Sequence, residues 1–370
     1  MRLVEVLRCP ELFACLGPRE QAEIISEARF FGMQSQLLPL FNGNCHYHRS
    51  IWGQLPLAVR QQLSNDFHRF SVQKRGLVRE LRMLTSALGD DAVQDMVVLK
   101  GAAYHLAKIE ELAGRTMSDI DVWVSERQLK GVEEKLVESG WVHSQLNSYD
   151  DRFYREWSQE IPPLKHYERR IELDVHFRIL PKALDSSDQA LNLLRYTQWT
   201  EQGIRVLTLP AMIIHSAIHL FYESEYRGGP RDLFDLYLLF SRLSQVPEGW
   251  HSLISIQEDV GQGDSVYLAL RYCQKLFRLA VPEKVMAFYS QYAPAPVALR
   301  LLDNAFMTVF SSGFPPHRPF GYDVMALALY LRGHVKRLPM PILLPHLVRK
   351  TGLAVANSFK KPEKEHEPLF

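Results

Sequence analysis

Residues 97–124 constrain the fold of this chain more strongly than any other stretch of its 370 residues. The stretch opens with a short aliphatic run that meets Lys100 and Gly101, which predicts a strand that ends in a tight turn. Residues 102–109 then have helix-forming character, with apolar side chains on one side. We therefore expect a strand, a glycine turn and a helix in immediate succession.

The second part of the stretch, residues 119–124, alternates between aliphatic side chains and Asp or Trp. This period of two predicts a strand that places Asp119 and Asp121 on one face, about 7 Å apart along it. Two such carboxylates repel each other unless a cation or a proton lies between them. Oxygen ligands favour Mg²⁺ or Mn²⁺ over zinc, and a glycine turn offers N–H groups to a phosphate. A metal beside a phosphate indicates phosphoryl or nucleotidyl transfer.

A two-metal site of this kind needs a third carboxylate, and residues 170–180 contain a candidate. This segment also alternates, and its polar face carries Glu172, Asp174, His176 and Arg178. An acid on a strand that follows the Asp-x-Asp strand completes the set. One Asp-x-Asp pair is common in loops, whereas three elements in this order are a far more specific signal.

The motifs that carry a family resemblance are Leu-Lys-Gly-Ala-Ala at 99–103, Ser-Asp-Ile-Asp-Val-Trp-Val at 118–124 and Glu-Leu-Asp-Val-His at 172–176. Together they resemble the nucleotidyltransferase superfamily of the DNA polymerase β type. Within it, the chain is similar to a group of bacterial proteins known as uncharacterised nucleotidyltransferases. The resemblance implies an α+β fold, in which a polymerase β-like domain with a mixed sheet is flanked by N-terminal and C-terminal helical regions. It also implies that Asp119, Asp121 and Asp174 are the catalytic residues and the metal ligands.

The candidates for nucleotide binding are Lys100, Gly101, Ala102, Arg115, Lys165 and His176. Gly101 matches the glycine of the superfamily's Gly-Ser or Gly-Gly turn, but Ala102 lacks the hydroxyl that usually contacts phosphate. We expect Lys100 to substitute for that hydroxyl as a point charge. The resembling group has an arginine at the place of Arg115 and a histidine at the place of His176. The alternative for each basic residue is a surface charge, and for His176 it is a buried structural role.

The resemblance implies a metal-dependent nucleotidyltransferase that moves a nucleoside monophosphate from a triphosphate such as ATP to a hydroxyl acceptor and releases pyrophosphate. Its cofactor would be Mg²⁺ or Mn²⁺. The sequence does not identify the acceptor, which would be a protein, an RNA or a glycan-related molecule. One alternative is a non-catalytic nucleotide-binding or scaffold protein of the same fold. Another is a toxin-like nucleotidyltransferase that modifies transfer RNA.

The pattern along the chain divides it into an N-terminal helical region at 1–92, a catalytic domain at 93–209, a C-terminal helical domain at 210–358 and a charged, disordered tail at 359–370. Within the first region, residues 55–88 form one long amphipathic pattern. We favour a helix that packs on the catalytic domain through its apolar side. The alternative is a nucleic-acid contact through its basic residues, which are Arg69, Lys74, Arg75, Arg79 and Arg82.

Further along the chain, Arg231 and Asp235 have the spacing of an ion pair along a helix. A similar helix occurs in the resembling enzymes, so this one forms either an internal ion pair or the far wall of the nucleotide cleft. His215 and His219 lie one turn apart but lack the Glu of a zinc-protease motif, so we expect them to be structural or to line the cleft. Residues 332–358 are basic and apolar; a packed terminal helix is favoured over a peripheral contact with a membrane or a protein partner.

The composition is that of an ordinary soluble globular protein. Lys and Arg number 43 against 42 Asp and Glu, which excludes a global basic field. The four cysteines form no Cys-x-x-Cys pair, which favours a reducing compartment, and the Cys-His-Tyr-His run at 45–48 lacks the further ligands of a zinc site. No apolar run reaches membrane-spanning length, and charges and a proline interrupt the start where a signal peptide is apolar. We expect a cytoplasmic protein.

Overall fold

The structure is a computed structural model that describes residues 2–43, 50–144, 148–169, 171–179, 193–222, 226, 228–261, 263–338, 341 and 343. The Cys-His-Tyr-His run at 45–48 and the tail predicted at 359–370 lie outside the described residues. The same is true of most of the basic and apolar segment at 332–358.

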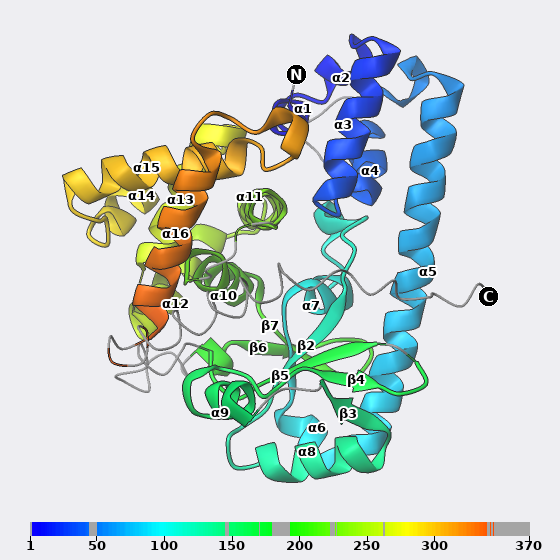
Figure 1. The fold of residues 1–370 in the computed structure, drawn as a ribbon, viewed down its shortest axis with the longest axis vertical. Coiled ribbons are helices and arrows are strands. Elements are labelled where there is room, and N and C mark those ends of the chain that lie inside the picture. Colours follow the sequence, from blue (N-terminus) through cyan, green and yellow to red (C-terminus); the bar gives the residue numbers. More distant parts are fainter. Residues whose placement is uncertain are drawn as a thin grey trace, which may run out of the picture.

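The N-terminal region is helical, as the sequence predicts. Its helices are α1 (Leu3–Arg8), α2 (Glu11–Ala14), α3 (Pro18–Phe30), α4 (Leu37–Phe41), α5 (Leu57–Leu88) and α6 (Asp90–Asp95), with the short 3₁₀ turns η1 (Gln34–Gln36) and η2 (Trp52–Gln54). Helix α5 is 32 residues long and runs along one side of the molecule, from the N-terminal helices to the region of α8 (Leu129–Glu138) (Figure 1). It buries one apolar stripe that includes Leu63, Leu77 and Leu81.

A mixed β-sheet forms the middle of the molecule, which confirms the predicted sheet type. Its strands are β1 (Val97–Val98), β2 (Asp119–Trp123), β3 (Trp141–His143), β4 (Leu164–His166), β5 (Glu172–His176), β6 (Thr197–Trp199) and β7 (Arg205–Leu207). Within the described part of the chain their order is β3-β4-β5-β2-β1-β7-β6. The pairs β2–β5 and β1–β7 are parallel, and the other neighbours are antiparallel.

Two predicted boundaries differ from those of the structure. The helix expected at 102–109 is α7 (Lys100–Leu106), so it begins two residues earlier and ends three residues earlier. The strand expected at 170–180 ends as β5 at His176, because the next residue, Phe177, donates its N–H to the carbonyl of Gln159 in the preceding loop. The remaining elements of this region are η3 (Glu110–Leu112) and α9 (Ser148–Trp157).

The C-terminal region is helical to Arg337, again as predicted. Its helices are α10 (Leu209–Tyr222), α11 (Gly229–Leu243), α12 (Gly249–Val260), α13 (Asp264–Phe277), α14 (Glu283–Ser290), α15 (Pro296–Ser311) and α16 (Tyr322–Arg337), with the 3₁₀ turn η5 (Pro315–His317). One hydrophobic cluster extends from Leu3 in α1 to Leu329 in α16, so all three regions share a core. The predicted domain boundaries at 92 and 209 stay predictions.

The N-terminal region packs closely on the loop that precedes β2. Gly114 in this loop has a φ of +88°, and a Cβ atom there would lie 2.3 Å from the carbonyl oxygen of Ser35. Thr116 of the same loop donates its hydroxyl to the carbonyl of Gly32. Because only glycine fits at position 114, this contact fixes the loop that carries Arg115.

Helix α16 exposes an apolar stripe on the outside of the molecule, formed by Val324, Leu327, Leu331 and Val335. It belongs in part to the segment for which the sequence allows a contact with a membrane or a protein, and that contact stays a prediction. A search of the described helices finds none that is both long and apolar enough to cross a membrane.

Candidate active site

The parallel pairing of β2 with β5 brings the three predicted catalytic carboxylates to one cavity. Asp121 lies directly opposite Asp174 in the register, and Asp119 lies two residues earlier on the same face of β2. All three line a cavity of about 280 Å³. Its other charged lining residues are Lys100, Arg115, Glu160, Arg231, Asp232, Asp235 and Arg337. The cavity is therefore polar and contains both cations and anions.

Asp121 is the most tightly bound of the three carboxylates. The Lys100 ammonium lies 2.5 Å from its Oδ1, and Nε2 of His176 lies 3.0 Å from the same oxygen. Burial alone would raise the pKa of Asp121, but Lys100 and His176 outweigh burial and hold that pKa well below its usual range. Burial would also lower the pKa of Lys100, but Asp121 and Glu160 outweigh it and raise that pKa. The two side chains thus form a charged pair.

Within the described part of the chain, neither Asp174 nor Asp119 forms an ion pair like that of Asp121. Burial, followed by the charges of Glu160 and Asp121, raises the pKa of Asp174 to about 7. Burial and the neighbouring Asp121 likewise raise the pKa of Asp119. The cavity therefore holds a surplus of negative charge around Asp174, which a cation would relieve.

The chemistry of these side chains fits a hard divalent cation, since carboxylate oxygens are the ligands that Mg²⁺ and Mn²⁺ prefer. Their placement fits only in part. Among the described residues, no three carboxylate, imidazole or thiol side chains are arranged so that they could hold a metal ion together. The ammonium of Lys100 stands beside Asp121 in the place of a metal cation. A metal at Oδ1 of Asp121 would therefore compete with the Lys100 ammonium for that oxygen.

The turn before α7 is built differently from the sequence expectation. The residue with left-handed backbone is Lys100, with a φ of 48°, whereas Gly101 needs no positive φ and a Cβ there would meet Met117 at an ordinary 3.5 Å. Gly101 lines the cavity, and the buried Ala102 is not among the lining residues. A left-handed conformation is unfavourable for lysine, so the contact with Asp121 helps to hold it.

Arg115 lines the cavity, but its charge is already paired. Its Nε donates to Oδ2 of Asp235 at 2.5 Å, and its Nη2 lies 3.5 Å from Asp232. Arg115 and Asp235 are 7% and 3% exposed. The sequence predicted that Arg115 would neutralise a triphosphate; in the structure its nearest anions are carboxylates of α11. The spacing of Arg231 and Asp235 allowed an ion pair between them, but Arg231 pairs instead with its neighbour Asp232 at 2.9 Å.

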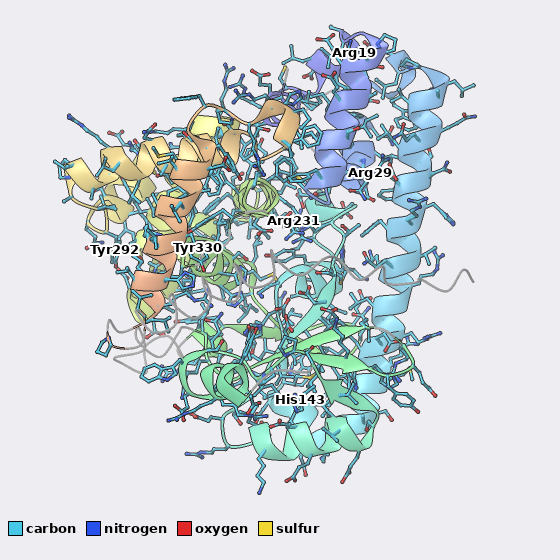
Figure 2. The ribbon with its side chains drawn as sticks, in the orientation of Figure 1. Arg19, Arg29, His143, Arg231, Tyr292 and Tyr330 are labelled. Atoms are coloured by element: carbon cyan, nitrogen blue, oxygen red, sulfur yellow. The ribbon has the colours of Figure 1, made fainter. Side chains whose placement is uncertain are left out.

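Helix α11 nevertheless forms a wall of the cavity, through Arg231, Asp232 and Asp235. Arg231 belongs to the first turn of α11 and lies on the side of this helix that faces the N-terminal helices (Figure 2), where a Cβ atom on Gly32 would approach its Nη1 to 3.8 Å. Its side chain remains 28% accessible. Of the wall residues, Arg231 is the cation that a ligand in the cavity can reach.

Glu160 is a further carboxylate of the cavity, beside Asp174, that the sequence did not predict. It belongs to the loop before β4 and forms an isolated β-bridge with His176. Its Oε2 lies 3.4 Å from Nδ1 of His176, so this buried histidine stands between Glu160 and Asp121. No strand pattern marks the loop around Glu160, and only the fold brings it to Asp174. His176 thus keeps its predicted place on the face of Asp174.

Residues 33–278 match the family described as uncharacterised nucleotidyltransferase. The chain belongs to this family. The match extends over the strands β2 and β5 and the helices α10 and α11, which together line the cavity, and it supports a transferase activity with a nucleotide substrate. Searches of curated proteins and of solved structures found no match.

Lys165 lies outside the cavity of this family member. It lies on β4, opposite Glu172 of β5, and its ammonium is 2.6 Å from the carboxylate of Glu172. Its side chain is 53% exposed. Glu172 is therefore its ion-pair partner, and Lys165 is not among the residues that line the cavity. The expected contact between Lys165 and a nucleotide stays a prediction, which its place outside the lining does not favour.

The two histidines of α10 take the second of their expected roles. His219 lines the main cavity, and both it and the buried His215 line a smaller adjoining cavity together with His176. Burial lowers the pKa of His215 well below its usual value, so it is neutral at physiological pH. It therefore adds no positive charge to the wall.

The raised pKa of Asp174 predicts how the free energy of unfolding of the metal-free protein depends on pH. A carboxyl group whose pKa rises from 3.8 to about 7 on folding destabilises the folded state progressively as pH rises through this interval. Asparagine resembles the protonated acid, so Asp174→Asn should stabilise the metal-free protein by up to roughly 3 kcal/mol at pH 8 and by less at pH 5. Chemical unfolding in EDTA at both pH values measures this. A variant that is less stable than the wild type at pH 8 would refute the assignment.

Proposed function

We propose that this protein is a metal-dependent nucleotidyltransferase of the DNA polymerase β type, which transfers a nucleoside monophosphate from a nucleoside triphosphate to a hydroxyl acceptor. The observation that carries the proposal is the register of β2 and β5, in which Asp121 faces Asp174 and Asp119 follows on the same face. Lys100, Gly101 and Tyr104, from the turn and helix that follow β1, line the same cavity, as a phosphate-binding turn would.

In this proposal Asp119, Asp121 and Asp174 hold Mg²⁺ or Mn²⁺. When bound, the metal neutralises charge on the phosphates and lowers the pKa of the acceptor hydroxyl. The acceptor oxygen forms a bond to the α-phosphorus, the bond to the leaving pyrophosphate breaks, and the hydroxyl proton passes to a carboxylate of the cavity. Asp174, with Glu160 beside it, is placed to receive that proton.

The basic side chains take two different roles. Lys100, which pairs with Asp121 here, would offer its ammonium to the phosphates in place of the hydroxyl that Ala102 lacks. Arg231 is accessible from the cavity and contributes a second positive charge. Arg115 is a positioning residue, since its pairing with Asp235 fixes α11 against the loop before β2.

Calorimetric titration with each nucleoside triphosphate, with and without Mn²⁺, tests the nucleotide part of the proposal. We expect Mn²⁺-dependent binding of at least one triphosphate. Incubation of that labelled triphosphate with cell extract, separated into protein, RNA and glycan fractions, should then label one fraction and release pyrophosphate. Triphosphate binding that is unchanged by Mn²⁺, with no pyrophosphate released in any fraction, would contradict the proposal and favour a nucleotide-binding scaffold.

A further inference from the structure

Helix α5 carries an exposed basic face that the proposed chemistry does not use. Its residues Arg69, Lys74, Arg75, Arg79 and Arg82 are all exposed. Between Asp66 and Asp90 its sequence contains only one acidic residue, Glu80, and that side chain is buried. The spacing of Arg75, Arg79 and Arg82 places them in one line along the helix, opposite the buried stripe.

The line of arginines leads to a groove of about 430 Å³, which we call the α5 groove. Its lining residues are Arg79, Arg82, Met83, Ser86, Ala87, Ser139, Trp141 and Arg169. The lining thus offers three guanidinium groups and two hydroxyls, and it includes no carboxylate. Such a set of donors binds anions, above all phosphate oxygens.

Part of this groove is fixed in advance. The guanidinium of Arg169 lies over the ring of the buried Trp141, and its Nε donates to the carboxylate of Glu80 at 2.7 Å. Glu80 thus consumes one positive charge and orients Arg169. The Arg79 side chain is 73% exposed, and its Nη2 lies 3.7 Å from Oε1 of Glu80, which is long for an ion pair. Within the described residues, no ion pair to Arg82 is found. Arg82 is therefore free to meet a ligand, and Arg79 can turn to one because its ion pair with Glu80 is long and its side chain is exposed.

The groove lies within a short distance of the proposed active site. At the cavity, Met117 donates its N–H to the side chain of Gln73 on α5, and Arg82 follows nine residues later, roughly 14 Å along the helix axis. Across the sheet, Trp141 begins β3, and three strand spacings separate β3 from β2, again about 14 Å. Both routes place the groove at the end of the sheet where Asp119 begins β2.

We propose that the exposed face of α5 and the α5 groove bind the phosphate backbone of a nucleic-acid acceptor. The distance to the cavity corresponds to about four phosphates at their spacing in a helical strand. A strand held by Arg75, Arg79 and Arg82 can therefore place its terminal hydroxyl in the cavity. This last step rests on the proposed nucleotidyl transfer, whereas the binding itself does not.

Fluorescence anisotropy with labelled RNA and DNA oligonucleotides of one sequence tests the binding, without nucleotide or metal. The test variant is Arg79→Ala/Arg82→Ala, which spares the half-buried Arg169 and should fold. The matched control is Lys284→Ala/Arg300→Ala, which removes the same charge from exposed positions on α14 and α15. Losing two backbone contacts should weaken binding roughly 20-fold at 0.1 M salt and flatten the salt dependence, whereas the control should change neither. The RNA and DNA arms show which source the groove accepts.

The proposal is overturned if the α5 variant and the control bind oligonucleotides equally well. It is also overturned if an acidic polypeptide of equal charge binds as tightly and with the same loss on mutation, which would indicate an acidic protein partner. Triphosphate binding by the α5 variant separates the two proposals, since it should remain at the wild-type level. Loss of oligonucleotide binding with intact triphosphate binding supports the α5 groove, even if no transfer to the oligonucleotide is found.

Discussion

Replacing Asp121 by asparagine is expected to reduce nucleotidyl transfer by roughly 10³-fold or more, the scale on which loss of a central electrostatic group acts. Asp121 is the shared centre of the cavity, because it faces Asp174 across the strands and binds both Lys100 and His176. An amide has the same shape but neither the charge for a metal nor that for Lys100. Pyrophosphate release measures the activity, and Mn²⁺ titration measures the metal site directly.

The matched control for this experiment is Lys165→Ala. Lys165 lies on the neighbouring strand β4, exposed and outside the cavity, so its removal should leave activity within about twofold of the wild type. Circular dichroism must show both variants folded. If Asp121→Asn retains more than a tenth of the activity, or binds Mn²⁺ as the wild type does, the cavity is not the site of transfer.

The features of the site that could be predicted are those that depend on local sequence. The alternation at Asp119 and Asp121, and again around Asp174, predicts a strand from a few residues alone. Burial of one face of that strand fixes which side chains share the other face. The long helix α5 was equally predictable, since its apolar stripe repeats over nine turns. In both cases the spacing of apolar residues in the sequence matches the repeat of the strand or the helix.

The features that could not be predicted depend on contacts distant in sequence. The pair of Arg115 with Asp235 joins residues 120 positions apart, and the sequence pattern around either residue does not predict its contact with the other. Glu160 reaches the cavity only because its loop forms a bridge with His176. The left-handed backbone of Lys100 could not be predicted, because glycine adopts that conformation far more readily and Gly101 is the adjacent residue. Charge in this cavity is therefore arranged by the tertiary fold.

Replacing Asp235 by alanine is expected to lower the free energy of unfolding by about 3 kcal/mol, because it leaves the buried guanidinium of Arg115 without its main partner. Asp232, 3.5 Å from Arg115, compensates in part and keeps the loss at the lower end of the range for a broken buried pair. Chemical denaturation measures the change. The exposed pair of Arg19 and Glu23 provides a control, since Glu23→Ala should cost less than about 0.5 kcal/mol.

A double variant, Arg115→Met/Asp235→Leu, separates the structural from the functional role of the buried pair. The two apolar side chains leave no unpaired charge, so the double variant should regain most of the stability that Asp235→Ala loses. Its transferase activity should nevertheless stay low, because Arg115 and Asp235 both line the cavity and join α11 to the loop before β2. If Asp235→Ala costs less than 1 kcal/mol, or if the double variant is fully active, the pair does not position the wall of the site.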